Sequence, residues 1–155
     1  GKFDTAEALA QAVADTWQGG DENRLVVCTG GEPLLQLDGP LIDALHGHGF
    51  LIAVETNGTL AAPHGETGGI DWICVSPKGN APLALTTGQE LKLVYPQTEL
   101  EAQPEQFDGL DFQHFFLQPM DGPDREKNTQ AVVSYCLRHP KWRLSVQSHK
   151  FIGIP

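Results

Sequence analysis

The sequence has few cysteines and no motif of closely spaced ones. Its three cysteines, Cys28, Cys74 and Cys136, lie more than 40 residues apart along the chain. This spacing excludes a compact set of metal-ligating thiols and the disulfide framework of a small secreted domain. Each cysteine lies in an apolar segment, which predicts a small buried side chain in a reducing cytosol. We therefore expect a cytoplasmic protein whose own residues bind no metal.

Long apolar runs and a positive charge balance are also absent. Runs such as 25–28 and 51–54 are far too short to span a membrane, and no signal-peptide pattern is present. Ten Lys and Arg against twenty Asp and Glu give a formal net charge of −10. This balance disfavours nucleic acid and anionic membranes as partners, although one or two local basic side chains can still hold a small anionic ligand.

The 155 residues predict a single domain over 1–155. Short apolar runs predict strands at 25–28, 51–54, 72–75, 91–95, 115–117 and 142–146. Helical spacing predicts helices over 4–17, 40–47 and 125–138. The first is expected to begin with an Asp4–Glu7 capping box, and the second with Asp38 and Pro40. Such runs, separated by helices or loops, predict a parallel sheet covered on both faces. Because a complete eight-stranded barrel needs about 250 residues, we expect an α/β fold that is either a shortened barrel or an open sheet.

Polar, Gly or Pro residues follow nearly every predicted strand. The clusters are 29–33, 55–58, 76–78, 118–121 and 147–150. Because the carboxyl ends of parallel strands meet at one rim, where ligands bind, this pattern predicts a small-molecule site.

Each cluster also has a simpler interpretation. The pair at 30–31 is compatible with a tight turn, and the pair at 57–58 with ordinary turn chemistry. Lys78 is compatible with a solvated charge, and His149 with a structural histidine. Lys92 is different, because lysine is disfavoured inside a strand unless it reaches a rim or a partner. No catalytic-triad order, P-loop or zinc pattern is present.

Several strings, taken in order, resemble the 7-carboxy-7-deazaguanine synthase family of radical S-adenosylmethionine enzymes. They are VCTGGEP at 27–33, ETNG at 55–58, VSPK at 75–78, ELK at 90–92, LQPM at 117–120 and WRLSVQSHK at 142–150. The GGE string alone is weakly specific, whereas the full ordered set is strongly specific. The resemblance runs from about residue 1 to 155. The resemblance implies a partial (shortened) parallel β/α barrel of the radical enzyme type, with its first strand missing.

The resemblance also implies an activity. Members convert 6-carboxy-5,6,7,8-tetrahydropterin to 7-carboxy-7-deazaguanine with loss of ammonia, a step toward queuosine and other deazapurines. They use S-adenosylmethionine, a 4Fe-4S cluster and Mg2+, and they are commonly homodimers.

Site residues follow from the resemblance by position. Those implied to bind S-adenosylmethionine are Gly31, Ser76, Pro77, Lys78, Gln118, Pro119, Met120 and Asp121. Thr29, His149 and the terminal carboxylate of Pro155 are implied to contact the pterin. No catalytic residue and no metal ligand is carried over, and the roles of Glu32, Glu55, Asn57 and Lys92 stay open.

The sequence departs from the family at its cluster cysteines. The C-x3-C-x2-C pattern, the first strand, the magnesium ligand and the N-terminal substrate contacts are absent, whereas Ser148 replaces a usual Thr and keeps the hydroxyl. Because three positioned thiolates are needed for such a cluster, we expect this chain alone to be inactive. Two alternatives stay open: a non-catalytic small-molecule-binding module that lost the cluster, and another radical enzyme such as a glycyl-radical-enzyme activase, which the SPK and WRLS strings disfavour.

Overall fold

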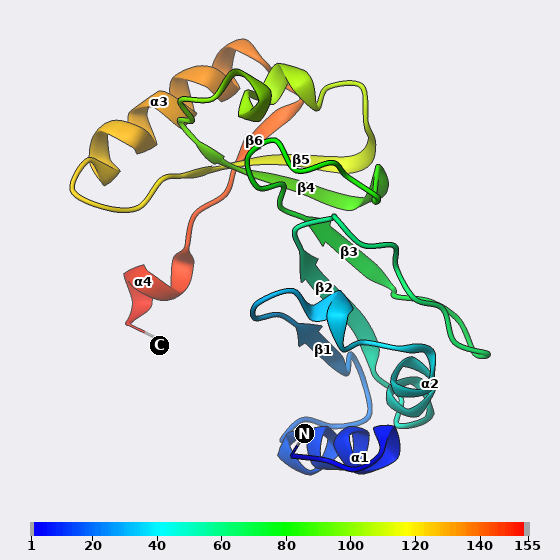
Figure 1. The fold of residues 1–155 in the computed structure, drawn as a ribbon. Coiled ribbons are helices and arrows are strands. Elements are labelled where there is room, and N and C mark those ends of the chain that lie inside the picture. Colours follow the sequence, from blue (N-terminus) through cyan, green and yellow to red (C-terminus); the bar gives the residue numbers. More distant parts are fainter. Residues whose placement is uncertain (1, 154–155) are drawn as a thin grey trace.

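The computed structural model describes residues 2–153, apart from the side chains of His149 and Phe151, and its centre is a curved parallel sheet (Figure 1). The strands are β1 (Leu25–Cys28), β2 (Leu51–Thr56), β3 (Trp72–Val75), β4 (Thr87–Tyr95), β5 (Asp111–Pro119) and β6 (Trp142–Leu144). They lie side by side in chain order, and each pair of neighbours is parallel. This is the order of a β/α barrel. Within the described residues β1 and β6 do not pair, so the barrel is open and β1 has a free edge.

Helices lie outside the curved sheet. They are α1 (Ala6–Thr16), α2 (Gly39–Gly47) and α3 (Arg125–Arg138). Short 3-10 turns lie between β1 and α2, at η1 (Pro33–Leu35), and between β4 and β5, at η2 (Leu100–Ala102) and η3 (Pro104–Gln106). The Asp4–Glu7 capping box is wrong: the Thr5 hydroxyl accepts the Ala8 N–H at 3.1 Å. Glu7 instead lies 2.9 Å from a ring nitrogen of His48. The expected start of α2 is confirmed, since the Asp38 carboxylate accepts an N–H of its first turn.

Two hydrophobic clusters hold these helices against the sheet. The first joins α1 and α2 to β1 and β2, with Ala10, Ile42, Leu45, Ile52 and Val54 at its centre. The second joins α3 to β3–β6, with Val75, Leu91, Leu117, Val132 and Trp142. The apolar runs are strands because alternate residues of each run enter one of these clusters. The predicted strand cores are therefore confirmed, although β4 begins earlier than expected and β6 ends earlier.

The other face of the sheet, here called the inner face, is not covered by these helices. Leu25, Val27 and Leu51 are 48%, 50% and 54% exposed on it. The expectation of a sheet covered on both faces is therefore wrong for the described residues. The physical reason is that α1–α3 all pack outside, and the links 57–71 and 76–86 contain no helix.

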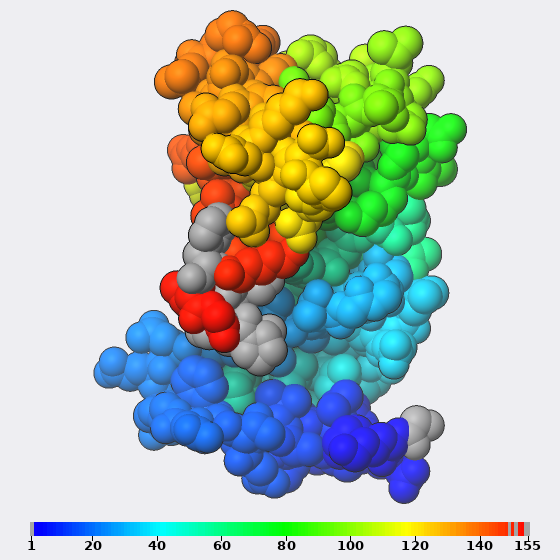
Figure 2. All heavy atoms as spheres, turned by 90° about the vertical axis from the view of Figure 1, so that its left-hand side faces the viewer, coloured from blue at the N-terminus to red at the C-terminus, as the bar shows by residue number. Residues whose placement is uncertain are grey.

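The last described helix lies on the open side of the sheet. Helix α4 (Ser148–Ile152) lies away from α1–α3 in Figure 1, and Figure 2 shows this segment in front of the molecule, between α1 below and α3 above. None of the described helices is both long enough and apolar enough to cross a membrane.

Candidate functional site

A cavity of about 330 Å³ opens at the carboxyl ends of the strands. It brings together five residues that the sequence predicts at the site: Thr29, Gly31, Ser76, Lys78 and Gln118. Its other lining residues come from the same strand ends and from the segment before α4: Gly30, Glu55, Thr56, Asn57, Lys92, Val94 and Gln147. The predicted rim is therefore present, and its size and polar lining suit a small molecule.

The remaining predicted residues lie beside this cavity or outside the described structure. Pro119 and Asp121 line a small adjoining hollow of about 40 Å³, which shares Gln118 with the main cavity. Pro77 and Met120 line neither hollow. The backbone of position 149 belongs to α4, but the His149 side chain lies outside the described residues. Pro155 lies outside them altogether.

The glycine pair after β1 forms an open part of the cavity wall. Gly30 has φ of +123°, a conformation that residues with a Cβ rarely adopt. A Cβ built on Gly31 would have no heavy atom within 4 Å. The backbone at 30–31 is thus bare toward the cavity, so a ligand can approach its polar groups closely.

Glu32 ties this loop to the end of β2. Its Oε1 accepts the Thr56 hydroxyl at 2.6 Å and the Leu34 N–H at 3.1 Å, while its Oε2 accepts the Asn57 N–H at 2.8 Å. No role for this residue could be predicted from the sequence. The structure gives it one: Glu32 fixes two neighbouring parts of the cavity wall relative to each other.

Glu55 and Lys92 form an ion pair in the cavity wall. The Lys92 ammonium lies 3.0 Å from Oε1 of Glu55. Burial alone would lower the pKa of Lys92, but the charges and hydrogen bond of its neighbours Cys74, Glu55 and Glu90 raise it overall. Lysine is disfavoured in the middle of a strand unless it reaches a partner, and Lys92 has such a partner in Glu55, 37 residues away in sequence.

Two further contacts shape the rim beyond β3 and β5. The Lys78 ammonium donates to the Ser76 hydroxyl at 3.3 Å, so both polar groups lie at the same wall. Lys150 of α4 forms an ion pair with Asp121, the residue after Met120. The hydrogen bond from Lys150 is the main cause of a lowered pKa at Asp121. This pair joins α4 to the loop that follows β5.

The thiols do not fit a metal cluster. Cys28 packs against the first hydrophobic cluster, Cys74 is buried within β3 and Cys136 lies on α3. Burial raises the pKa of all three thiols, that of Cys74 to about 12. Among the described residues no group of three or more His, Cys, Asp or Glu side chains could hold a metal ion. The cavity wall, by contrast, offers hydroxyls, ammonium groups and bare backbone.

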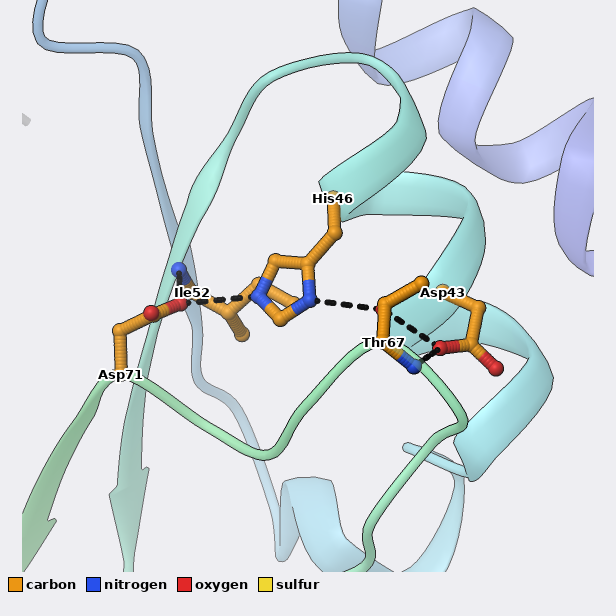
Figure 3. A network of polar contacts seen from close by, with 5 residues as sticks. All are labelled: Asp43, His46, Ile52, Thr67 and Asp71. Atoms are coloured by element: carbon orange, nitrogen blue, oxygen red, sulfur yellow. Dashed lines mark hydrogen bonds and ion pairs between the residues drawn. The ribbon is translucent and has the colours of Figure 1, made fainter.

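A second polar cluster lies at the opposite end of the sheet (Figure 3). His46 lies 3.0 Å from Asp71 and 3.2 Å from the Thr67 hydroxyl. That hydroxyl donates to Asp43 at 2.6 Å, so its proton is not directed at His46 as a hydrolase triad would require. Burial would raise the pKa of Asp71, but hydrogen bonds from the Ile52 N–H and His46 lower it overall. The cluster joins α2 to the loop before β3.

The chain is similar in sequence and in fold to known proteins. No family model matches the chain. Over all 155 residues it is 64% identical to the 7-carboxy-7-deazaguanine synthase of Caulobacter vibrioides, of which it covers 71%. It is 59% identical to the enzymes of that name from Bradyrhizobium diazoefficiens and Bordetella pertussis, covering 99% and 100% of this chain and 70% and 71% of theirs. Among solved structures it is similar to QueE from Escherichia coli, with a TM-score of 0.70, 29% identity, and coverage of 92% of this chain and 63% of that one.

Proposed function

The chain belongs to the 7-carboxy-7-deazaguanine synthase family, and we propose on this premise that its cavity binds S-adenosylmethionine together with 6-carboxy-5,6,7,8-tetrahydropterin. The reaction is conversion of that pterin to 7-carboxy-7-deazaguanine with loss of ammonia, in queuosine and deazapurine biosynthesis. The observation that carries the proposal is the 64% identity to a synthase of this name over the whole chain. The clustering of Thr29, Gly31, Ser76, Lys78 and Gln118 at one cavity supports it.

In this proposal S-adenosylmethionine lies along the ends of β1, β3 and β5. Its amino acid end pairs with the bare backbone at Gly31, where a side chain would intrude. The Ser76 hydroxyl and the Lys78 ammonium pair with its polar atoms. Four more residues are proposed to border the position of S-adenosylmethionine: Pro77, Pro119, Met120 and Asp121. When bound, the cofactor and the iron–sulfur cluster supply the radical that removes a hydrogen atom from the substrate.

The pterin occupies the part of the cavity beside Thr29. The hydroxyl of Thr29 both donates and accepts hydrogen bonds, which suits a pterin edge carrying N–H and C=O groups. His149 and the carboxylate of Pro155 are its further proposed contacts. Both would approach from the C-terminal segment, whose helix α4 is tied to the rim by the Lys150–Asp121 pair.

The cluster and Mg2+ need ligands, and the part of the chain that the structure describes holds no group of three or more His, Cys, Asp or Glu side chains that could bind a metal ion. The chain spans about 70% of the length of its curated relatives. Its three thiols are unsuited to a cluster, because they are separated and are either buried, as in Cys74, or partly buried, as in Cys28 and Cys136. We therefore propose that the iron–sulfur and magnesium ligands lie outside residues 1–155. We also propose a cytoplasmic homodimer with no nucleic-acid or membrane partner, in keeping with the resemblance and with the net charge of −10.

A chimeric enzyme tests the proposal. The matched region of the Caulobacter vibrioides relative is replaced by residues 1–155, and the product is reconstituted with iron and sulfide. We expect the chimera to form 7-carboxy-7-deazaguanine from the carboxy-tetrahydropterin. The isolated 155-residue chain should show neither iron–sulfur absorption nor turnover.

Two results would contradict the proposal. Product formation by the isolated chain would refute the placement of the cluster ligands. A folded, cluster-loaded chimera that forms no product, while the unmodified relative does, would refute the assigned function. If that chimera still bound S-adenosylmethionine, the result would favour the non-catalytic binding module instead.

A further inference from the structure

The ion pair between Lys92 and Glu55 has one enclosed end and one open end. Lys92 on β4 reaches across β3 to Glu55 on β2, and the ammonium lies 3.0 Å from Oε1. The Lys92 side chain is 19% exposed, whereas that of Glu55 is 49% exposed. The ammonium is therefore held within the wall, and the carboxylate lies half open at a cavity that both residues line.

The charges around Lys92 make this arrangement stable at neutral pH. Three acidic groups face the ammonium from its own strand and from the two strands beyond: Glu90, Cys74 and Glu55. Since the pKa of the Cys74 thiol is raised to about 12, that thiol is neutral at pH 7. The two carboxylates are then the negative charges that hold Lys92 in its protonated form, and Glu55 is the one that also lines the cavity.

Glu55 is the neighbour of Thr29, the residue that the proposed function places against the pterin. The β1–β2 register pairs Cys28 with Val54, so the next positions along the two strands are Thr29 and Glu55. Side chains alternate between the two faces along a strand. Glu55 therefore lies on the inner face, as does Leu51, which precedes it in β2 by an even number of residues. Both neighbours line the same cavity. A ligand that reaches Thr29 thus reaches Glu55 as well.

We propose that Lys92 is a positioning residue that orients Glu55 as a hydrogen-bond acceptor for the pterin substrate. Lys92 holds Oε1, which leaves Oε2 of Glu55 to accept N–H groups of the reduced pterin. An ionised acceptor makes the stronger, charge-assisted bond. The inference rests on the proposed function and adds to it a specificity element for an N–H-rich heterocycle.

The test compares variants of the chimeric enzyme. In Lys92→Met the carboxylate loses its anchor, and we expect the KM and Kd for the pterin to rise roughly tenfold, which is what one charge-assisted hydrogen bond contributes. The kcat should change little, because the lost contact is made to the bound substrate and not only in the transition state. Affinity for S-adenosylmethionine should stay unchanged. Lys127→Met, an exposed lysine on α3, is the matched control.

Further variants separate positioning from a general structural effect. Lys92→Arg keeps a positive partner for Glu55 and should recover most of the pterin affinity. Glu55→Gln should weaken pterin binding about as much as Lys92→Met does. The double variant should bind the pterin no more weakly than the single variant with the lower affinity, because the two residues act as a unit. Circular dichroism checks that each variant is folded. If Lys92→Met does not fold, the nearly isosteric Glu55→Gln and the Lys92→Arg variant decide the question.

Three outcomes would overturn the inference: pterin affinity of a folded Lys92→Met within about twofold of the parent, an equal loss of S-adenosylmethionine affinity, or fully additive losses in the double variant. The proposed function fails separately, since that failure appears already as absent turnover in the unsubstituted chimera. Pterin binding measured by equilibrium dialysis still tests Lys92 in that case.

Discussion

Replacing Glu32 by glutamine should loosen the cavity wall without changing its shape. The carboxylate accepts three hydrogen bonds, from the Thr56 hydroxyl and from the N–H groups of Leu34 and Asn57. Glutamine has a single acceptor oxygen, so it can serve the donors at one carboxylate position only. If its oxygen replaces Oε1, the Asn57 N–H faces an amide NH2 group and loses its partner.

The expected loss follows from these contacts. One hydrogen bond to a charged acceptor contributes about 1.5–3 kcal/mol, and the two retained bonds become weaker because their acceptor is no longer charged. We therefore expect the free energy of unfolding to fall by about 2–3 kcal/mol. For a protein of this size, such a loss lowers the melting temperature by roughly 5–10 °C.

Thermal unfolding of the chimeric enzyme, followed by circular dichroism, measures this change. Hydrogen exchange localises it, since the Leu34 and Asn57 amides should exchange faster in Glu32→Gln. Glu22→Gln, at an exposed position, is the control and should lie within about 0.5 kcal/mol of the parent. If Glu32→Gln melts at the same temperature as this control and hydrogen exchange is unchanged, the hydrogen bonds of Glu32 do not contribute to stability. A loss of ligand binding alone would then make Glu32 a direct ligand contact.

Three further predictions concern the turn after β2, the cluster at the opposite end of the sheet, and the C-terminus. Gly58→Ala should destabilise the protein by about 1–3 kcal/mol in urea unfolding, since φ is +79° and a Cβ would lie 2.6 Å from Val75; Gly20→Ala, which meets no atom within 4 Å, should not. The pKa of Asp71 is lowered from 3.8, so its stabilising effect is complete at neutral pH and is lost as the pH falls below about 4. Asp71→Asn should therefore be less stable than the parent at pH 7 and approach it near pH 3; a constant difference across this range would contradict the assignment. One glycine added after Pro155 should weaken pterin binding in the chimera roughly tenfold and leave S-adenosylmethionine binding unchanged; normal pterin binding would remove Pro155 from the proposed site.

The strands could be predicted because their chemistry is local. In runs such as 51–54 every second residue enters a hydrophobic cluster, and polar residues begin where the strand reaches the rim. The beginning of β4 was missed, because it depends on strand pairing rather than on local composition. Thr87 and Gly88 pair with β5, but nothing in their own composition marks a strand. The first helix cap was misplaced by one residue because Asp4 and Thr5 both offer an oxygen acceptor, and only the backbone decides between them.

The roles of Glu32 and Lys92 could not be predicted, because their partners are distant in sequence. Glu32 reaches residues 24 and 25 positions away, and Lys92 reaches one 37 positions away. No spacing rule relates such pairs. They become neighbours only when parallel strands bring their carboxyl ends to one rim. The exposed inner face was missed for a related reason: apolar runs predict burial, but they do not tell whether one helical layer or two supply it.

The rim carboxylates explain how an acidic chain can present a selective site. Both carboxylate oxygens of Glu32 accept hydrogen bonds from within the protein, from the Thr56 hydroxyl and the Asn57 N–H. Glu32 therefore shapes the cavity wall. Glu55 and Asp121 each pair with a lysine yet remain 49% and 50% exposed. Neutralised by Lys92 and Lys150, these two can accept hydrogen bonds without repelling a ligand that carries its own carboxylate. Both proposed ligands carry a carboxylate as well as N–H donors. A rim of paired rather than isolated charges is therefore suited to both, and removing Lys92 should affect the binding of the pterin and not that of S-adenosylmethionine.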